Sequence, residues 1–321
     1  MPPQREDFAQ FARGFLMGGA DIIPGVSGGT VALVLGIYRR LVTAISHLDL
    51  HLLSLAAQRR WSDAVEYSDL RFLISLAVGI LTGIVGLAKL MRYMLLEERM
   101  FTLAVFFGLI LGSSWIVARM VKPKNSKQLA KSLFLAAAAA FFAYWLVGLE
   151  QVRFQDSLGY FFLSGSLAIC AMILPGISGA YILWLLGMYA AVTALIENIL
   201  HLQFSQRDLA TLLVFVSGCA IGLICFSKLL RSLLAHFYRS TMAVLGGFMV
   251  GSLRGMWPFQ TDLTPEIEKL KFKRYESYLP ETWSSDVTIC LLLALAAVTV
   301  LVLLERCGTP QEPNEGQVVV N

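Results

Sequence analysis

Long stretches without a charged side chain constrain this sequence more than any other feature. The stretches run over residues 72–88, 101–118, 132–149, 209–227 and 287–304. With its flanks, each is long enough to cross about 30 Å of hydrocarbon as an α-helix. We therefore predict five transmembrane helices, and a shorter apolar stretch over residues 240–253 is predicted as a sixth span.

The composition supports a membrane protein and excludes several other classes. Of the 321 residues, 57% are hydrophobic and only 15% are charged, whereas about a quarter are charged in soluble globular proteins. These values exclude a soluble, disordered, fibrous or disulfide-stabilised secreted protein. The five cysteines form no CxxC pair and the four histidines are scattered, so we expect no metal site and no cofactor. We also expect no nucleic-acid partner.

Two further apolar windows, residues 14–38 and 157–196, are each broken in the middle by a Pro-Gly pair. Residues 20–30 (ADIIPGVSGGT) align without a gap on residues 171–181 (AMILPGISGAY), and the match continues from Gly36 and Tyr38 to Gly187 and Tyr189. Further residues match at one constant offset: Gly79, Gly83, Lys89, Arg92, Thr102, Gly108, Gly112 and Ser113 fall on Gly218, Gly222, Lys228, Arg231, Thr241, Gly247, Gly251 and Ser252. This self-similarity indicates a duplicated unit.

Each half is predicted to contain one broken hairpin followed by three spans. The number of membrane crossings per half is then odd, so the first half starts and ends on opposite sides of the membrane. The second half is therefore inserted in the opposite orientation. We predict an all-α polytopic membrane protein with two inverted-topology repeats, each a Pro-Gly-broken, re-entrant helical hairpin plus three transmembrane helices. Repeat 1 covers residues 1–150 (hairpin 8–46, surface helix 47–69, spans 70–149), repeat 2 covers 151–308 (hairpin 157–197, spans 207–305, outer loop 260–285), and 309–321 form a flexible tail.

The distribution of basic residues predicts the orientation in the membrane. On this topology, Lys and Arg are more numerous on the side that holds both termini. The positive-inside rule therefore predicts both termini in the cytoplasm. Segment 47–69, which mixes leucines and Trp61 with charges, is predicted to lie on the cytoplasmic surface.

The two breaks are the candidates for a binding site. Proline disfavours helix at the preceding residue and glycines allow backbone shapes that a Cβ would forbid, so helix should stop near residue 22 and restart near Ser27. Unwound backbone inside a membrane must be buried in protein or line a cavity, and a restarting helix favours an anion. The predicted anion-binding residues are Pro24, Gly25, Ser27, Gly28, Gly29 and Thr30 in the first break and Pro175, Gly176, Ser178 and Gly179 in the second. The alternative is a helix-packing joint of small residues.

Two basic pairs repeat in the two halves. Lys89 and Arg92 lie three apart on one helix face, and Lys228 and Arg231 are their counterparts. Inversion places one pair near the outer side and the other near the cytoplasmic side. If they point inward, a phosphate could pass from one pair to the other, with Arg binding its oxygens bidentately. The alternative is that these cations reach out from helix ends to lipid head groups.

Asp21 is the one charged residue in its window, and its counterpart in the second half is Met172. Carboxylates inside a membrane are energetically costly and usually functional. We predict Asp21 as a proton-coupling residue. The alternative is that it accepts hydrogen bonds from the backbone amides of the following turn, or pairs with an arginine.

At these residues the chain resembles the PopT-type polyprenyl-phosphate transporters, a bacterial membrane family once known only as a domain of unknown function. The motifs that carry the resemblance are GADIIPGVSGGT at residues 19–30, GIY at 36–38, LPGISG at 174–179 and GMY at 187–189. The resemblance implies a multi-pass protein of the bacterial inner membrane that moves undecaprenyl phosphate from the outer to the cytoplasmic leaflet. Because moving an anion inward opposes a negative-inside potential, proton uptake would help.

Two other functions compete with this hypothesis. Membrane undecaprenyl pyrophosphatases resemble this layout, but their pattern has an arginine directly after the serine of the Pro-Gly-x-Ser turn. Here Gly28 and Gly179 follow the two serines, so we expect no enzyme. A transporter or channel for a small soluble anion could use the same helix ends and stays open. The expected partners are a polyprenyl-phosphate lipid and the bilayer, and the oligomeric state, a homo-oligomer included, stays open.

Overall fold

The computed structural model describes residues 3–22, 27–201, 203–266, 273 and 275–307. In this part of the chain nearly all regular structure is helical. The first half contains α1 (Pro3–Asp21), α2 (Gly28–Val34), α3 (Tyr38–Ser46), α4 (Leu50–Ala57), α5 (Trp61–Tyr67), α6 (Leu70–Glu97), α7 (Arg99–Met120) and α8 (Ser126–Val147). The second contains α9 (Leu158–Ile173), α10 (Gly179–Leu185), α11 (Tyr189–Leu200), α12 (Gln206–His236), α13 (Tyr238–Ser252), the 3-10 turn η1 (Leu253–Met256), a hairpin of β1 (Gln260–Asp262) and β2 (Tyr275–Ser277), and α14 (Ser285–Cys307).

The five predicted spans are confirmed as helices long and apolar enough to cross a membrane: α6, α7, α8, α12 and α14. Their outward faces are apolar, as lipid requires. On α6, for example, the side chains of Val78, Leu81 and Val85 are 49%, 63% and 80% exposed. The predicted sixth span forms α13, which has only 15 residues and continues into η1. Because α13 is short and largely buried, it packs inside the bundle.

Helix is interrupted at both predicted breaks. Helix α1 ends at Asp21, and α2 restarts at Gly28 with Ser27 as its N-cap. A second turn follows each short helix, at Gly36 and at Gly187, and both glycines have φ +71°. This left-handed conformation favours glycine because it lacks a Cβ. After the turn at Gly187, α11 is bent by 110° from α10.

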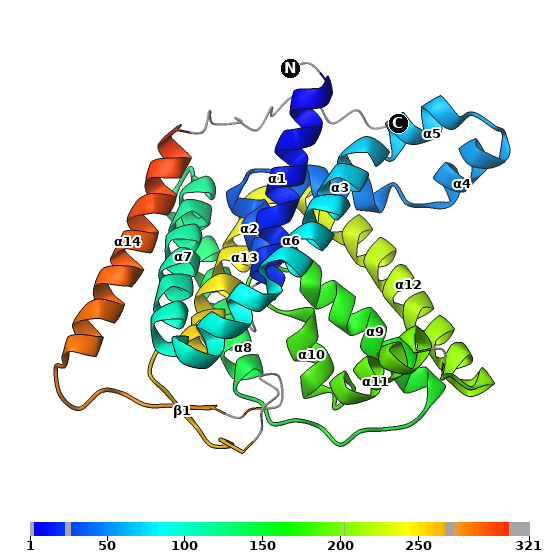
Figure 1. Ribbon diagram of the computed structural model, residues 1–321. Helices are drawn as coiled ribbons and strands as arrows, with labels where there is room; N and C mark the ends of the chain where they lie inside the picture. The colour runs from blue at the N-terminus through cyan, green and yellow to red at the C-terminus, as the bar shows by residue number, and fades with distance from the viewer. Residues whose placement is uncertain (1–2, 23–26, 202, 267–272, 274, 308–321) are drawn as a thin grey trace.

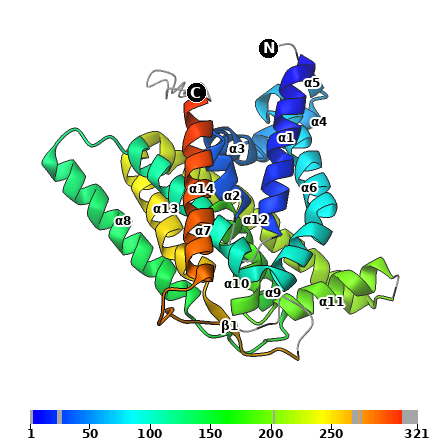
Figure 2. The same cartoon turned by 60° about the vertical axis from the view of Figure 1, so that its left-hand side comes forward.

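The long helices associate in pairs. α1 lies along α6 and α9 lies along α12, whereas α8 packs against α13 and α14 packs against α7 (Figures 1 and 2). The last span of each half therefore packs against the other half. Close approach at all four contacts depends on small residues, as in other membrane helix pairs. At each contact a backbone carbonyl oxygen overlaps the position that a Cβ on a glycine would take, which leaves no room for a side chain. The pairs are Phe11 with Gly79, Phe162 with Gly218, Ala294 with Gly108, and Ala136 with Gly247.

Two opposite sides of the molecule can be distinguished. The start of α1, the end of α14, and helices α4 and α5 lie at the top of Figures 1 and 2, and we call this the terminal side. The β1–β2 hairpin lies at the bottom, which we call the hairpin side. α6 runs from the terminal side to the hairpin side, and α12 runs the other way (Figure 1).

Segment 47–69 forms two short helices rather than the single surface helix that was predicted. The chain reverses between α4 and α5, where Arg59 adopts φ +57°. Helix α4 is N-capped by Asp49, whose carboxylate accepts hydrogen bonds from the amides of His51 and Leu52 at 3.0 and 3.2 Å. The two helices project from the bundle on the terminal side (Figure 1).

Candidate functional site

The two breaks meet inside the bundle. Ser27 Oγ donates a hydrogen bond to the carbonyl of Met172 at 3.0 Å. Thr30 Oγ1 accepts a hydrogen bond from the amide of Gly176 at 3.0 Å. Ser27 and Thr30 are 1% and 4% exposed, so both donor and acceptor side chains of the first break are buried. Side chains of the first break therefore hold the backbone of the second. Pro24 and Gly25, two predicted site residues, lie outside the described residues.

A third contact comes from beyond the first break. Tyr38, which is fully buried, donates from its hydroxyl to the carbonyl of Ile173 at 3.1 Å. The same carbonyl lies 2.6 Å from where a Cβ on Gly29 would stand, so glycine is required for this close approach. Sequence reasoning placed Tyr38 in the repeated motif but assigned it no role. The alignment of Tyr38 with Tyr189 in the repeat was the sequence signal that could have pointed to this role.

The start of α2 is occupied by a carboxylate of the protein itself. The amide of Gly28 donates to Asp21 Oδ1 at 2.6 Å, and the amide of Gly29 donates to Ser27 Oγ at 3.1 Å. A Cβ on Gly28 would lie 2.7 Å from Asp21 Oδ2, so the carboxylate approaches as closely as a side chain can. Asp21 thus makes the amide contact that the sequence allowed as its alternative role. It stands at the position where the sequence predicted an external anion.

The start of α10 differs from that of α2. Ser178 is the N-cap residue, but its hydroxyl makes no capping hydrogen bond and its side chain is only partly buried. The neighbouring Gly176 has φ +86°, and a Cβ there would lie 2.9 Å from the backbone of Met249. Met172 replaces Asp21 in this half, and within the described part of the chain no carboxylate caps α10. Of the two breaks, the second leaves its capping hydroxyl available to a ligand.

The two basic pairs lie apart from the breaks. In the described chain, no hydrogen bond or ion pair links Lys89, Arg92, Lys228 or Arg231 to either break, and all four side chains are exposed. Lys89 and Arg92 lie in the part of α6 that approaches the hairpin side. The other pair lies in the part of α12 that approaches the terminal side, where Lys228 Nζ is 3.3 Å from Asp49 Oδ2. Sequence reasoning missed Asp49, and nothing in the local pattern marked it.

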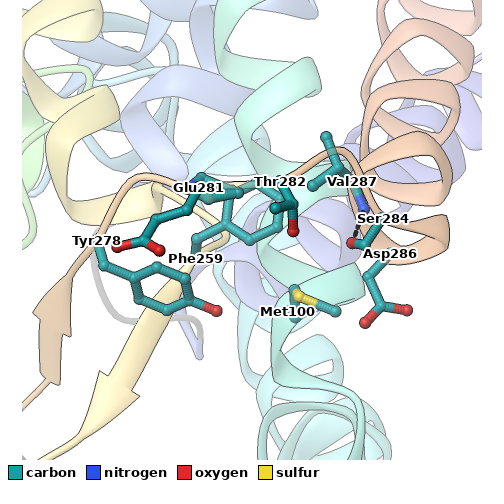
Figure 3. A pocket seen from close by; sticks show the side chains of 9 residues that line it. Met100, Phe259, Tyr278, Glu281, Thr282, Ser284, Asp286 and Val287 are labelled. Atoms are coloured by element: carbon teal, nitrogen blue, oxygen red, sulfur yellow. Dashed lines mark hydrogen bonds between the residues drawn. The ribbon is translucent and has the colours of Figure 1, made fainter.

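Two pockets lie away from the described residues of the breaks. The one in Figure 3 has a volume of about 210 Å³ and is lined by Met100, Phe259, Tyr278, Pro280, Glu281, Thr282, Ser284, Asp286 and Val287. Its two carboxylates disfavour an anion. The other, of about 260 Å³, lies between the loop that precedes α9 and the helices α11 and α12, and includes Asp156, Arg207 and Asp208. Arg207 there is already paired with Asp156 at 2.8 Å.

Thr30→Val is expected to destabilise the protein by about 1–3 kcal/mol, because it leaves the buried amide of Gly176 without its acceptor. Thr30→Ser keeps the oxygen and should cost much less. Chemical unfolding of the detergent-solubilised protein would measure both changes. Equal losses for the two variants would show that the methyl group, not the hydrogen bond, matters at this position.

Comparisons with known proteins place the chain among lipid transporters of bacteria. A family model described as undecaprenyl phosphate translocase-like matches residues 17–271. A polyprenyl-phosphate transporter of Vibrio cholerae is 36% identical over 305 residues, covering 92% of this chain and 95% of that protein. A polyprenyl-phosphate transporter of Staphylococcus aureus is 32% identical over 266 residues, covering 79% of this chain and 88% of that protein. No solved structure matches the chain.

Proposed function

The chain belongs to the undecaprenyl phosphate translocase-like family, and on that basis we propose how it moves its lipid across the membrane. It is a multi-pass membrane protein whose function is polyprenyl-phosphate transport. The proposed substrate is undecaprenyl phosphate, carried from the outer to the cytoplasmic leaflet of the bacterial inner membrane. The protein acts as a transporter and not as an enzyme.

The observation that carries this proposal is the direct contact between the two helix breaks and the helix ends beside them, inside an apolar bundle. An isolated ion would need tens of kcal/mol to enter hydrocarbon, so a phosphate needs polar groups along its path. The apolar tail of the lipid can remain in the bilayer while the head group passes. Backbone groups freed at helix breaks are the usual source of such a path in transporters.

The two breaks have different tasks in this proposal. The head group binds first at the second break, where the Ser178 hydroxyl and the first turn of α10 are not capped by a carboxylate. At the first break, Asp21 holds the equivalent position beside Gly28. The phosphate takes over that position once a proton neutralises Asp21. Transport of an anion and uptake of a proton are thereby coupled.

The inverted-repeat architecture and the orientation are part of the proposal. Support for the repeats comes from the equivalent glycine contacts, such as Gly83 on Phe15 and Gly222 on Ser166, and from the mutual exchange of α8 and α14 between the halves. We assign the terminal side to the cytoplasm, because Lys and Arg are more numerous there. Lys89 and Arg92 then attract head groups at the outer side, and Lys228 and Arg231 receive them at the cytoplasmic side.

Lys89→Ala and Lys228→Ala are each expected to weaken binding of undecaprenyl phosphate, by about two- to fivefold. Both side chains are exposed, and charge pairs at exposed positions contribute only about 0.2–1 kcal/mol. Titration of the lipid against the protein in nanodiscs would measure the change. Normal binding by both variants would favour the alternative, in which these lysines contact bilayer head groups.

The function itself is tested by reconstitution of the purified protein alone into liposomes. We expect undecaprenyl phosphate to move between leaflets faster than in protein-free liposomes, without release of inorganic phosphate from undecaprenyl pyrophosphate. A parallel assay with inorganic phosphate separates a lipid transporter from a small-anion channel. Phosphate flux without lipid movement would overturn the proposed function.

A further inference from the structure

The carboxylate of Asp49 links helices α4 and α5 to Lys228 of the second basic pair. Asp49 Oδ2 lies 3.3 Å from Lys228 Nζ and accepts a hydrogen bond from the Tyr67 hydroxyl at 3.4 Å. Its other oxygen, Oδ1, caps α4. The Asp49 side chain is 17% exposed, whereas that of Lys228 is 47% exposed. The carboxylate therefore has a fixed position beside a lysine that is still open to solvent.

Aromatic contacts hold Asp49 in this position. The rings of His47 and Tyr67 stack with centroids 4.3 Å apart, and the ring of His51 meets Tyr67 edge-on at 4.9 Å. His47 Nδ1 also lies 2.7 Å from the carbonyl of Tyr67. The start of α4 and the end of α5 are thus tied together, so Asp49 cannot move away from α12 unless this cluster shifts.

The charges of the cluster do not balance. Partial burial opposes ionisation of Asp49, but the amide of Leu52 and the ammonium of Lys228 lower the pKa of its carboxyl below the ordinary value. Burial and, to a lesser degree, the nearby cations Arg231 and Lys228 lower the pKa of His47, against the hydrogen bond to the Tyr67 carbonyl, so a positive charge on its ring is disfavoured. The cluster then holds two cations, Lys228 beside Asp49 and Arg231 near His47 and Tyr67, and one carboxylate. In the described chain, Arg231 has no ion pair, so the cluster retains the capacity to attract a further anion.

The basic pair of the other half has no such carboxylate. Lys89 and Arg92 are exposed, and in the described residues neither forms an ion pair. The two halves differ in the segment that precedes the helix carrying the basic pair, which is α6 in the first half and α12 in the second. In the first half, residues 47–69 intervene between α3 and α6, whereas only residues 201–205 separate α11 from α12. The added segment of the first half reaches across to the second half and brings Asp49 to Lys228 alone.

We propose that Asp49 is an internal competitor of the phosphate head group at Lys228 and Arg231. This inference rests on the function proposed above, and it assigns Asp49 a role in release. An arriving phosphate monoester draws the exposed ammonium of Lys228 away from the fixed carboxylate. Return of the ammonium to Asp49 then removes the lysine from the phosphate, so that the lipid leaves into the cytoplasmic leaflet and does not remain bound to the pair.

Asp49→Asn separates this role from helix capping, because asparagine is as good an N-cap as aspartate but carries no charge. We expect the variant to bind undecaprenyl phosphate in nanodiscs about two- to fivefold more tightly and to release it more slowly. The matched control is Asp63→Asn. Asp63 pairs with Arg60 at 2.5 Å within the same segment, and its replacement should leave binding unchanged. Asp49→Ser, which also caps, is a second variant if the first folds poorly.

A double-mutant cycle tests whether the effect acts through Lys228. In a Lys228→Ala background, Asp49→Asn should no longer tighten binding. Titrations with inorganic phosphate and with phosphatidylglycerol show whether the competition concerns any phosphate or specifically a lipid phosphate monoester. Unchanged or weaker binding by Asp49→Asn and by Asp49→Ser would overturn the inference. If Lys228→Ala still weakens lipid binding in that case, only the inference about Asp49 is wrong and the proposed function stands. If liposomes that contain the wild-type protein show no lipid transport, the proposed function itself is wrong.

Discussion

Gly83→Ala is expected to destabilise the protein by about 1–3 kcal/mol or more, the range for overpacking at a tight contact. Gly83 lies where α6 crosses α1, and a Cβ there would overlap the carbonyl oxygen of Phe15 and lie 3.1 Å from its Cα. Both obstacles are backbone atoms, so no side-chain rotation can relieve them. α1 would have to move away from α6, and the first broken hairpin would move with it.

Gly86→Ala is the matched control on the same helix. A Cβ at Gly86 would lie 3.7 Å from a ring atom of Phe15, which is an ordinary contact. Alanine favours helix over glycine by about 1 kcal/mol, so this variant should be slightly more stable than wild type. Thermal unfolding in detergent should therefore shift in opposite directions for the two variants. Equal shifts would show that α1 and α6 do not pack as described.

The predictable part of the fold is the part that depends on local sequence. The length of an uncharged stretch determines whether a helix can cross hydrocarbon, and all five predicted spans are confirmed. The breaks are equally local, since proline and glycine act on their own neighbourhood. The restart of helix after Ser27 was therefore correctly predicted.

The pairing of the helices was not predictable in the same way. Gly108 and Gly247 each require a small-residue partner, and both α8 and α14 supply alanines. Nothing in the local sequence shows that Gly108 meets Ala294 while Gly247 meets Ala136. The contact between Asp49 and Lys228 likewise joins segments far apart in the chain. Such long-range choices follow from the packing of the whole bundle.

For the candidate site, the sequence located the breaks but could not assign their contacts. It left Asp21 with two roles, proton coupling and acceptance of backbone amides. The hydrogen bond from the amide of Gly28 corresponds to the second role. The two roles are compatible in the proposed function, because a carboxylate at the proposed anion position must be neutralised or displaced before a phosphate binds there.

Asp21→Asn is expected to remove the pH dependence of transport while the protein still folds. In the wild type the amide of Gly28 lies 2.6 Å from Asp21 Oδ1. Asparagine keeps a side-chain oxygen that can accept the same hydrogen bond. It cannot carry a charge or take up a proton. In the wild type, protonation of Asp21 removes its repulsion of the phosphate and weakens the competing charge-assisted hydrogen bond. Wild-type transport should therefore rise as the pH on the outer side falls, whereas the variant should show a flat profile.

The expected size of the effect follows from the membrane potential. One uncompensated negative charge that moves inward against about 100 mV costs about 2.3 kcal/mol, which corresponds to about a 50-fold loss in rate. Leaflet-resolved transport of undecaprenyl phosphate in liposomes should therefore fall by up to about 50-fold in Asp21→Asn when such a potential is imposed, and far less without it. Asp63→Asn, which alters a carboxylate remote from the breaks, should keep the wild-type profile. A wild-type pH slope in Asp21→Asn would exclude Asp21 as the proton carrier, because the variant has no group at that position to titrate.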